Sequence, residues 1–155
     1  MSQTTIRSEP SVQRARALRH RRELDRLDYL RTLRELAGSM RQEEIARQVG
    51  VSQAAVSKAL ASARSVPAVP ESFSGASPYE IAERFAVGEL TREQVVDELS
   101  RWPYDSSATS DGYDALIVDQ PGTHTWAEVE RAVDDGLIDD DIYDEVGRAT
   151  ASATQ

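Results

Sequence analysis

The hydrogen-bonding side chains that follow Ser52 are the residues best suited to recognising another molecule. Gln53, Ser57 and Lys58 occur at spacings that place them together on the outer side of a helix. The amide of Gln53 and the hydroxyl of Ser57 both donate and accept hydrogen bonds, and Lys58 adds a positive charge. No arrangement of serine, histidine and aspartate accompanies them. The chemistry that they offer is therefore polar recognition and not bond breaking.

Residues 42–49 are predicted to form a short helix that ends at Gly50. Ile45, Ala46 and Val49 fall at positions i, i+1 and i+4, so they share one helical face. A glycine adopts the left-handed backbone that commonly ends a helix without a steric penalty. The sequence therefore predicts a helix with one apolar face and a sharp turn directly after it.

A second short helix is predicted to begin after Ser52, whose hydroxyl can cap it. Val56 and Leu60 lie four residues apart and are expected to face the first helix. Val51, in the turn, is expected to point inward. These apolar positions predict a tight pair of helices in which the second helix turns its polar side outward.

This pair resembles the helix-turn-helix of DNA-binding proteins, as in bacterial and phage regulators. The resemblance covers about 20 residues and agrees at six apolar or glycine positions. They are Ile45, Ala46, Val49, Gly50, Val51 and Val56. The resemblance implies that the helix after Ser52 enters the major groove of DNA, where its early residues meet base edges.

The resemblance also implies a role for each outward side chain. Gln53 would bond to adenine in a bidentate manner, and Ala54 would touch a thymine methyl group. Ser57 would bond to a base or a phosphate, and Lys58 to a phosphate or a guanine. Residues near the helix starts and the neighbouring arginines would meet phosphate oxygens. The complete predicted DNA-binding set is Arg41, Gln42, Arg47, Ser52, Gln53, Ala54, Ser57, Lys58 and Arg64.

A long helix is predicted before this pair, over residues 11–37, because the segment lacks proline and has no glycine before its end. Leucines recur at every third residue from Leu24 to Leu36. This spacing drifts around a helix of about 3.6 residues per turn, so one face cannot cover it. Either the helix is clasped on two sides or a second chain shares it. Leu18, Leu24 and Leu27 are left without a role in the N-terminal bundle, which predicts a homodimer.

The first half of the long helix is strongly basic. Residues 14–26 contain six arginines and His20. These side chains could follow DNA phosphates and give the chain a salt-sensitive affinity for DNA. They could equally form a solvated face that Glu23, Asp25 and Asp28 partly neutralise. No catalytic role is expected for His20.

The charge of the chain is divided unevenly between its two parts. The formal net charge of the 155 residues is −9. Residues 1–66 carry 13 basic and 7 acidic residues, whereas residues 67–155 carry 5 and 20. Such an asymmetry suggests two tasks, the first of them near an anion. We predict a basic DNA-binding domain at 1–66, a linker rich in proline, serine and glycine at 67–76, and an acidic helical domain at 77–155.

The acidic part follows one plan twice. Two pairs of short helices are predicted, and Gly88 and Gly136, which are 48 residues apart, end the first helix of each pair. Capping boxes are expected at the first three helix starts and an aspartate cap at the fourth. The predicted capping residues are Ser77, Thr91, Thr125 and Asp139. The repeat is either a duplication or two unrelated hairpins that use the same common capping residues. The two hairpins are expected to pack on each other or on a partner.

The fold class is therefore predicted to be all-α, with residues 114–119 as a short extended segment. The chain has no cysteine, which excludes disulfides, thiolate zinc sites and cysteine nucleophiles. The N-terminus lacks the apolar run of a signal peptide, and no stretch reaches the roughly 20 apolar residues of a membrane span. The acids at 139–145 do not have the spacing of a calcium-binding loop. We predict a cytoplasmic protein that is not an enzyme and needs no metal or cofactor.

A sequence-specific transcriptional regulator that binds DNA as a dimer is the leading prediction. The alternative is an antitoxin-like protein, whose acidic half neutralises a partner protein while the basic half regulates its own operon. Tryptophan and tyrosine often anchor protein interfaces. The candidate anchors are Tyr79, Phe85, Trp102, Tyr104, Trp126 and Tyr143. A third possibility is that the acidic half folds onto the basic half, mimics DNA and inhibits binding.

Overall fold

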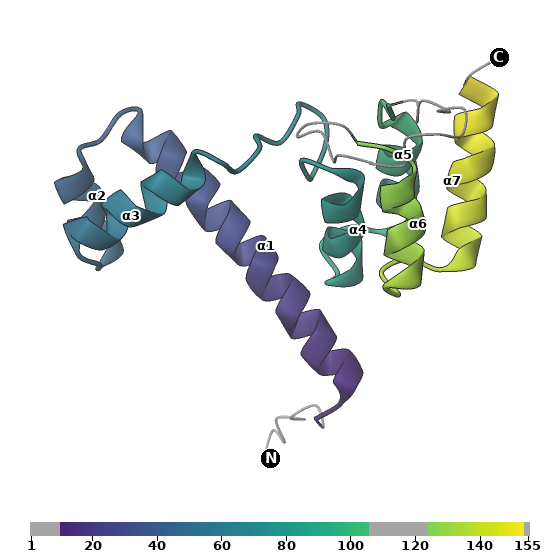
Figure 1. Ribbon diagram of the computed structural model, residues 1–155, viewed down its shortest axis with the longest axis horizontal. Helices are drawn as coiled ribbons and strands as arrows, with labels where there is room; N and C mark the ends of the chain where they lie inside the picture. Colours follow the sequence, from purple (N-terminus) through teal and green to yellow (C-terminus); the bar gives the residue numbers. More distant parts are fainter. Residues whose placement is uncertain (1–9, 106–123, 154–155) are drawn as a thin grey trace, which may run out of the picture.

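The computed structural model describes residues 10–105 and 124–153, and these ranges form seven helices and no strand. The prediction of an all-α fold is confirmed. The helices lie in two lobes, joined by the first helix and by an extended segment (Figure 1). The predicted extended segment at 114–119 lies outside the described residues. None of the described helices has the length and apolar composition needed to cross a membrane.

The N-terminal lobe contains three helices. They are α1 (Val12–Ala37), α2 (Gln42–Val49) and α3 (Gln53–Ala63). α3 packs against both α1 and α2. The centre of the lobe is a small core in which Leu33 from α1 meets Ile45 and Ala46 from α2 and Val56 from α3. The predicted helical pair is therefore held in place by the end of the long helix.

Two valines of the predicted inner face lie elsewhere. Val49 is 44% exposed and Val51 is 39% exposed, so the expectation that Val51 points inward is wrong. The core between α1, α2 and α3 is small and is already filled by Leu33, Ile45 and Val56, with Leu60 packed at its edge. The two valines on either side of Gly50 therefore lie at the surface of the lobe.

The C-terminal lobe contains four helices. They are α4 (Pro78–Ala86), α5 (Arg92–Arg101), α6 (Ala127–Asp134) and α7 (Asp140–Ala153). The two hairpins pack on each other, α4 against α6 and α5 against α7. Ile81, Leu99 and Val129 are fully buried in the shared core. Each hairpin thus covers the apolar face that the other could not bury alone.

The caps and turns follow the predicted plan with two exceptions. Gly88 and Gly136 have φ angles of +88° and +73°, which fit their place after the first helix of each hairpin. The Thr91 capping box is complete, because the Thr91 and Gln94 side chains each bond the other's backbone N–H. The capping box expected at Thr125 is wrong: Trp126 stands at the cap of α6 without a side-chain hydrogen bond. The glutamate of that predicted box pairs with His124 instead.

The second exception lies at the start of α4. The hydroxyl of Ser77 accepts a hydrogen bond from the backbone N–H of Glu80, as a cap should. The carboxylate of Glu80, however, accepts a hydrogen bond from the backbone N–H of Ala76 and bonds to arginines of α1 and α4. Hydrogen bonds between charged groups are stronger than those to a backbone N–H. Glu80 therefore bonds to the arginines and does not complete the predicted capping box.

The segment between the lobes is fixed to both of them. Val66 lies in a small core with Leu30 and Ala63. At the other end, the hydroxyl of Ser74 donates a 2.6 Å hydrogen bond to the carboxylate of Glu98. Phe73 packs against the C-terminal core. The predicted domain boundaries remain a prediction, but the segment at 67–76 makes specific contacts with its neighbours.

α1 packs against both lobes. Its end supports α3, and its middle packs against α4. Leu24 is fully buried, and Leu27 packs partly buried beside Leu30. Of the three leucines that motivated the predicted dimer, Leu18 alone remains well exposed, at 51%. The folding of one chain therefore accounts for two of these leucines, and the dimer itself remains a prediction.

Candidate nucleic-acid interface

The start of α3 is set by its sequence. The backbone of Gly50 has a φ angle of +86°, and a Cβ atom there would meet no neighbour within 4 Å. The glycine is therefore required by backbone conformation and not by crowding. The hydroxyl of Ser52 accepts a 3.1 Å hydrogen bond from the backbone N–H of Ala55, which caps α3 as predicted.

The end of α3 is held by a side chain of α1. The Arg34 guanidinium donates hydrogen bonds of 2.8 and 2.7 Å to the carbonyl oxygens of Ala63 and Val66. Carbonyl groups at a helix end carry partial negative charge, which a cation stabilises. Val56 is buried on the inner side of α3. This contact, together with the two hydrogen bonds from Arg34, fixes which side of α3 faces outward.

The outer side of α3 presents polar groups to solvent. Gln53, Ala54, Ser57 and Lys58 are all exposed. No hydrogen bond or ion pair engages the side chains of Gln53, Ser57 or Lys58 within residues 10–105 and 124–153. These donors and acceptors are free to meet an external partner.

The outer side also includes a residue outside the predicted DNA-binding set. Ala61 is exposed and lies four residues after Ser57 and three after Lys58, so it shares their strip of the helix. Its small side chain lets a partner approach closely, and its methyl group can contact a thymine methyl, as proposed for Ala54. Helical periodicity was the signal that could have identified it.

The remaining predicted contact residues surround this helix. Arg41, Gln42 and Arg64 are exposed. Arg47 is also exposed, but its guanidinium bonds to the carboxylate of Glu44 on the same helix. An exposed pair of this kind is worth little and is easily exchanged for a phosphate contact. All nine predicted DNA-contacting residues therefore lie at the surface, and their contacts with DNA remain a prediction.

The basic half of α1 has a mixed role. Arg21 donates a 2.7 Å hydrogen bond to the carbonyl oxygen of Val87, so it is tied to the C-terminal lobe. Arg26 pairs with Glu23. Arg19 and Arg22 make no such contact in the described part of the chain. These two arginines help to line an open groove of about 610 Å³ between α1, α4 and α6, together with Glu23, Glu83 and Arg131.

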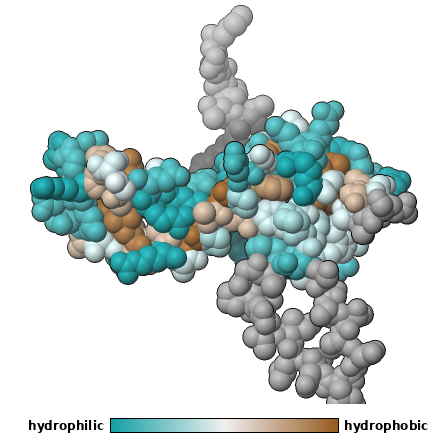
Figure 2. Space-filling view, turned by 90° about the horizontal axis from the view of Figure 1, so that it is seen from above, coloured by the Kyte–Doolittle hydropathy of each residue, from teal (hydrophilic) through white to brown (hydrophobic). Residues whose placement is uncertain are grey.

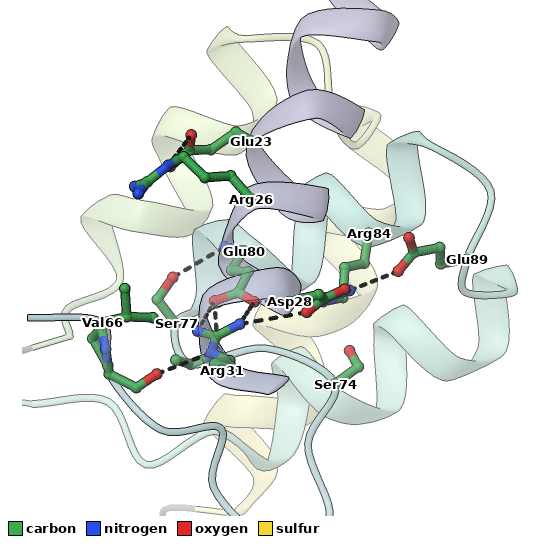
Figure 3. A network of polar contacts seen from close by, with 12 residues as sticks. Glu23, Arg26, Asp28, Arg31, Val66, Ser74, Ser77, Glu80, Arg84 and Glu89 are labelled. Atoms are coloured by element: carbon green, nitrogen blue, oxygen red, sulfur yellow. Dashed lines mark hydrogen bonds and ion pairs between the residues drawn. The ribbon is translucent and has the colours of Figure 1, made fainter. Parts of the chain in front are cut away.

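A buried ion-pair network joins α1 to α4 (Figure 3). The Arg31 guanidinium donates two parallel hydrogen bonds of 2.7 and 3.0 Å to the carboxylate of Glu80. Its third nitrogen donates to the carbonyl oxygen of Pro67 at 3.1 Å. Both side chains of the pair are buried. Because water cannot solvate their charges there, each charge is stabilised by the other and by these hydrogen bonds.

Arg84 completes the network from the side of α4. It donates to both carboxylate oxygens of Asp28, at 3.1 and 2.7 Å, and to Glu80 at 2.9 Å. Glu89 accepts a further hydrogen bond at 2.8 Å. We call Asp28, Arg31, Glu80 and Arg84 the α1–α4 seam. It fixes the C-terminal lobe against the helix that supports α3.

Burial and hydrogen bonding pull the pKa values of the α4 carboxylates in opposite directions. Burial by itself would raise the pKa of Glu80, but hydrogen bonds from Arg31, the Ala76 N–H and Arg84 lower it below its usual value. Burial raises the pKa of Glu83, against the opposing effect of a 2.7 Å hydrogen bond with His20. The seam therefore lowers the pKa of Glu80, whereas burial raises the pKa of Glu83.

The acidic half does not cover the outer side of α3 in the described structure. Its contact with the basic half is made through α4 and the middle of α1. Seen from above, the lobe at the left of Figure 2 is mainly hydrophilic at its outer tip. The described structure thus gives no support to the possibility that the acidic half mimics DNA.

The six candidate anchor aromatics have packing roles in the C-terminal lobe. Trp102 is buried in its core, and the other five pack against that core. The hydroxyl of Tyr79 bonds to Asp135 and the ring lies under the guanidinium of Arg131, 4.3 Å away. Their role in binding a partner remains a prediction, and no described feature favours the antitoxin-like alternative.

Residues 31–81 match the model of the Cro family, a family of helix-turn-helix DNA-binding repressors. Over these residues the chain is similar to that family, and it carries a helix-turn-helix. The match runs from α1 through α2 and α3 to the first turn of α4, which is less than half of the chain. The match confirms the predicted resemblance to helix-turn-helix proteins and supports a DNA-binding regulator. Neither a curated protein nor a solved structure matches the chain.

Proposed function

We propose that the chain is a transcriptional regulator that binds an operator through the outer side of α3. The observation that carries this proposal is the free polar strip of α3 within the segment that matches the Cro family. Gln53, Ser57 and Lys58 are exposed and unpaired in the described part of the chain. Their side chains have the donors and acceptors that read base edges in the major groove.

The charge distribution supports the same orientation. The chain as a whole is negative and would be repelled by DNA, but residues 1–66 contain an excess of basic residues. Arg41 and Arg64 are exposed beside the helix pair. Approach with the N-terminal lobe foremost therefore places α3 at the DNA and keeps the acidic lobe away from it.

The test is a gel-shift experiment on sequences that the full chain selects from a random DNA pool. Gln53→Ala should cost about 1–3 kcal/mol at one base position and relax the preference there. Lys58→Ala should weaken binding and, where it contacts a phosphate, reduce the salt slope by about 1. Gln13→Ala, which removes an exposed glutamine far from α3, is the matched control.

The proposal requires selection of a defined sequence by the parent chain. If the pool yields no preferred sequence, or if the two α3 variants select and bind like the Gln13→Ala control, then α3 is not the reading helix.

A further inference from the structure

One strip of α1 is covered by neither lobe. Leu18, Arg22, Asp25 and Tyr29 follow at intervals of four, three and four residues, which keeps them on one side of the helix. Leu18 is 51% exposed and Tyr29 is 42% exposed. Arg22 and Asp25 are exposed, and neither is paired within the described ranges. We call these four residues the α1 strip.

The α1 strip lies outside the side of α1 that packs against α4, although its edge at Asp25 is close to Arg21, which bonds to Val87. His20, Leu24 and Arg31 lie on the side of α1 that packs against α4, as their contacts and burial show. At about 100° per residue, Tyr29 and Arg31 lie roughly 160° apart around the helix. Arg22 stands at the border between the strip and the groove that it helps to line. A molecule bound to the strip would therefore meet α1 first.

The strip has a self-complementary order: apolar, basic, acidic, apolar. Its members are symmetric about the midpoint between residues 23 and 24. In an antiparallel pair of α1 helices with a two-fold axis at that midpoint, Leu18 of one copy faces Tyr29 of the other. Arg22 of each copy faces Asp25 of the other. A two-fold interface requires this kind of surface, because the same patch serves both partners.

We propose that the α1 strip is the interface between two copies of this chain, with their α1 helices antiparallel. The interface holds two symmetric ion pairs between two apolar contacts. Its charges favour a second copy, because each unpaired charge of one strip meets its opposite on the other. The charges of residues 67–155 do not favour self-association in this way, since this part carries 20 acidic and only 5 basic residues.

The pairing also fits a two-part operator, and this step alone rests on the proposed function. Leu33 lies beneath the helix-turn-helix. In the proposed register, the two Leu33 residues are separated by the length of 19 helical residues, about 28 Å along α1. Recognition helices of helix-turn-helix dimers meet half-sites about 34 Å apart. The antiparallel pair therefore separates the two Leu33 positions, on which the helix-turn-helix units pack, by a distance of the same order as one DNA turn.

The test is a charge exchange in the full chain, measured by sedimentation equilibrium without DNA. The parent should dimerise. Arg22→Asp and Asp25→Arg should each raise the dimer Kd at least tenfold, because each places like charges opposite one another twice. The double variant with both exchanges should restore dimerisation. Arg16→Asp makes the same charge change at an exposed position about 120° around α1 from Arg22, and it should leave the dimer intact.

Circular dichroism of every variant checks that the helices remain, since all the exchanged residues are exposed. A monomeric parent, a dimer that tolerates both single exchanges, or a double variant that stays monomeric overturns the proposal. Binding to a single half-site by the monomeric variants separates the two ideas. If those variants still show the preference that depends on Gln53, the reading helix stands whatever the fate of the dimer.

Discussion

The outer side of α3 and the α1–α4 seam contain similar types of residue in opposite environments. Both contain charged and hydrogen-bonding side chains. In the seam, Arg31 and Glu80 are buried, and each makes several hydrogen bonds within the molecule. On α3, Gln53 and Lys58 are exposed and have no partner in the described ranges. Burial and pairing, and not residue type, separate a structural cluster from the surface that we propose for DNA recognition.

The largest difference between the two regions should appear when the central carboxylate of the seam is removed. Glu80→Ala leaves Arg31 and Arg84 without their shared carboxylate. Breaking a buried charge pair typically costs 3–5 kcal/mol, so the free energy of unfolding should fall by about that amount. Urea denaturation measures it.

Asp97→Ala is the matched control for this change. It removes a carboxylate whose ion pair with Arg101 is exposed. Such a pair contributes about 0–1 kcal/mol. Equal losses for the two variants would show that the seam is no more important than a surface ion pair.

The stability that Glu80 contributes to the seam should depend on pH. The folded-state pKa of Glu80 lies below its ordinary value of 4.5, so its contribution is present above that value and is lost as the pH falls through the folded pKa. Glu80→Gln should therefore be less stable than the parent at pH 7. The difference should shrink below about pH 4.5. Thermal unfolding across pH 3–7 tests this, and a difference that grows in acid would contradict it.

A smaller effect is expected at the turn that orients α3. Gly50→Ala forces a side chain into a left-handed backbone with a φ angle of +86°. This should cost about 1–2 kcal/mol in the free energy of unfolding. In contrast, Gly147→Ala lies inside α7, where the new Cβ would stand 3.9 Å from Trp126, and it should stabilise by roughly 0.5–1 kcal/mol. A tolerated alanine at residue 50 would mean that the turn can change its shape.

The smallest effect on stability is expected on α3 itself. Ser57→Ala and Lys58→Ala remove exposed side chains that have no described partner, so each should change the free energy of unfolding by no more than about 0.5 kcal/mol. Affinity for the selected DNA should nevertheless fall. Chemical denaturation and gel shifts on the same preparations check both expectations. A large loss of stability would place these residues with the seam.

Local features of the fold were predictable from the sequence, because neighbouring residues create them. The cap at Ser52, the left-handed turn at Gly50 and the cap at Asp139 involve groups within a few residues of one another. The same is true of the polar strip of α3, which follows from helical periodicity. The resemblance to a DNA-binding family could therefore be seen in a short stretch.

The seam could not be predicted in the same way. Arg31 and Glu80 are 49 residues apart, and the sequence places each in an ordinary helical context. The i, i+4 spacing of Glu80 and Arg84 was visible, but it does not show which face the pair would bury. Similarly, composition marks Trp102 as a candidate anchor, whereas its place in the core depends on how two hairpins meet.

The sharing of α1 by the two lobes limits how the protein can be divided. A fragment that stops at residue 66 would keep the whole of α1 but lose α4. Leu24 would then face water, and Arg31 would lose its carboxylate. The shortest fragment that preserves the native surroundings of α1 must extend beyond α4, so excising the N-terminal lobe would change the surroundings of the helix that supports α3.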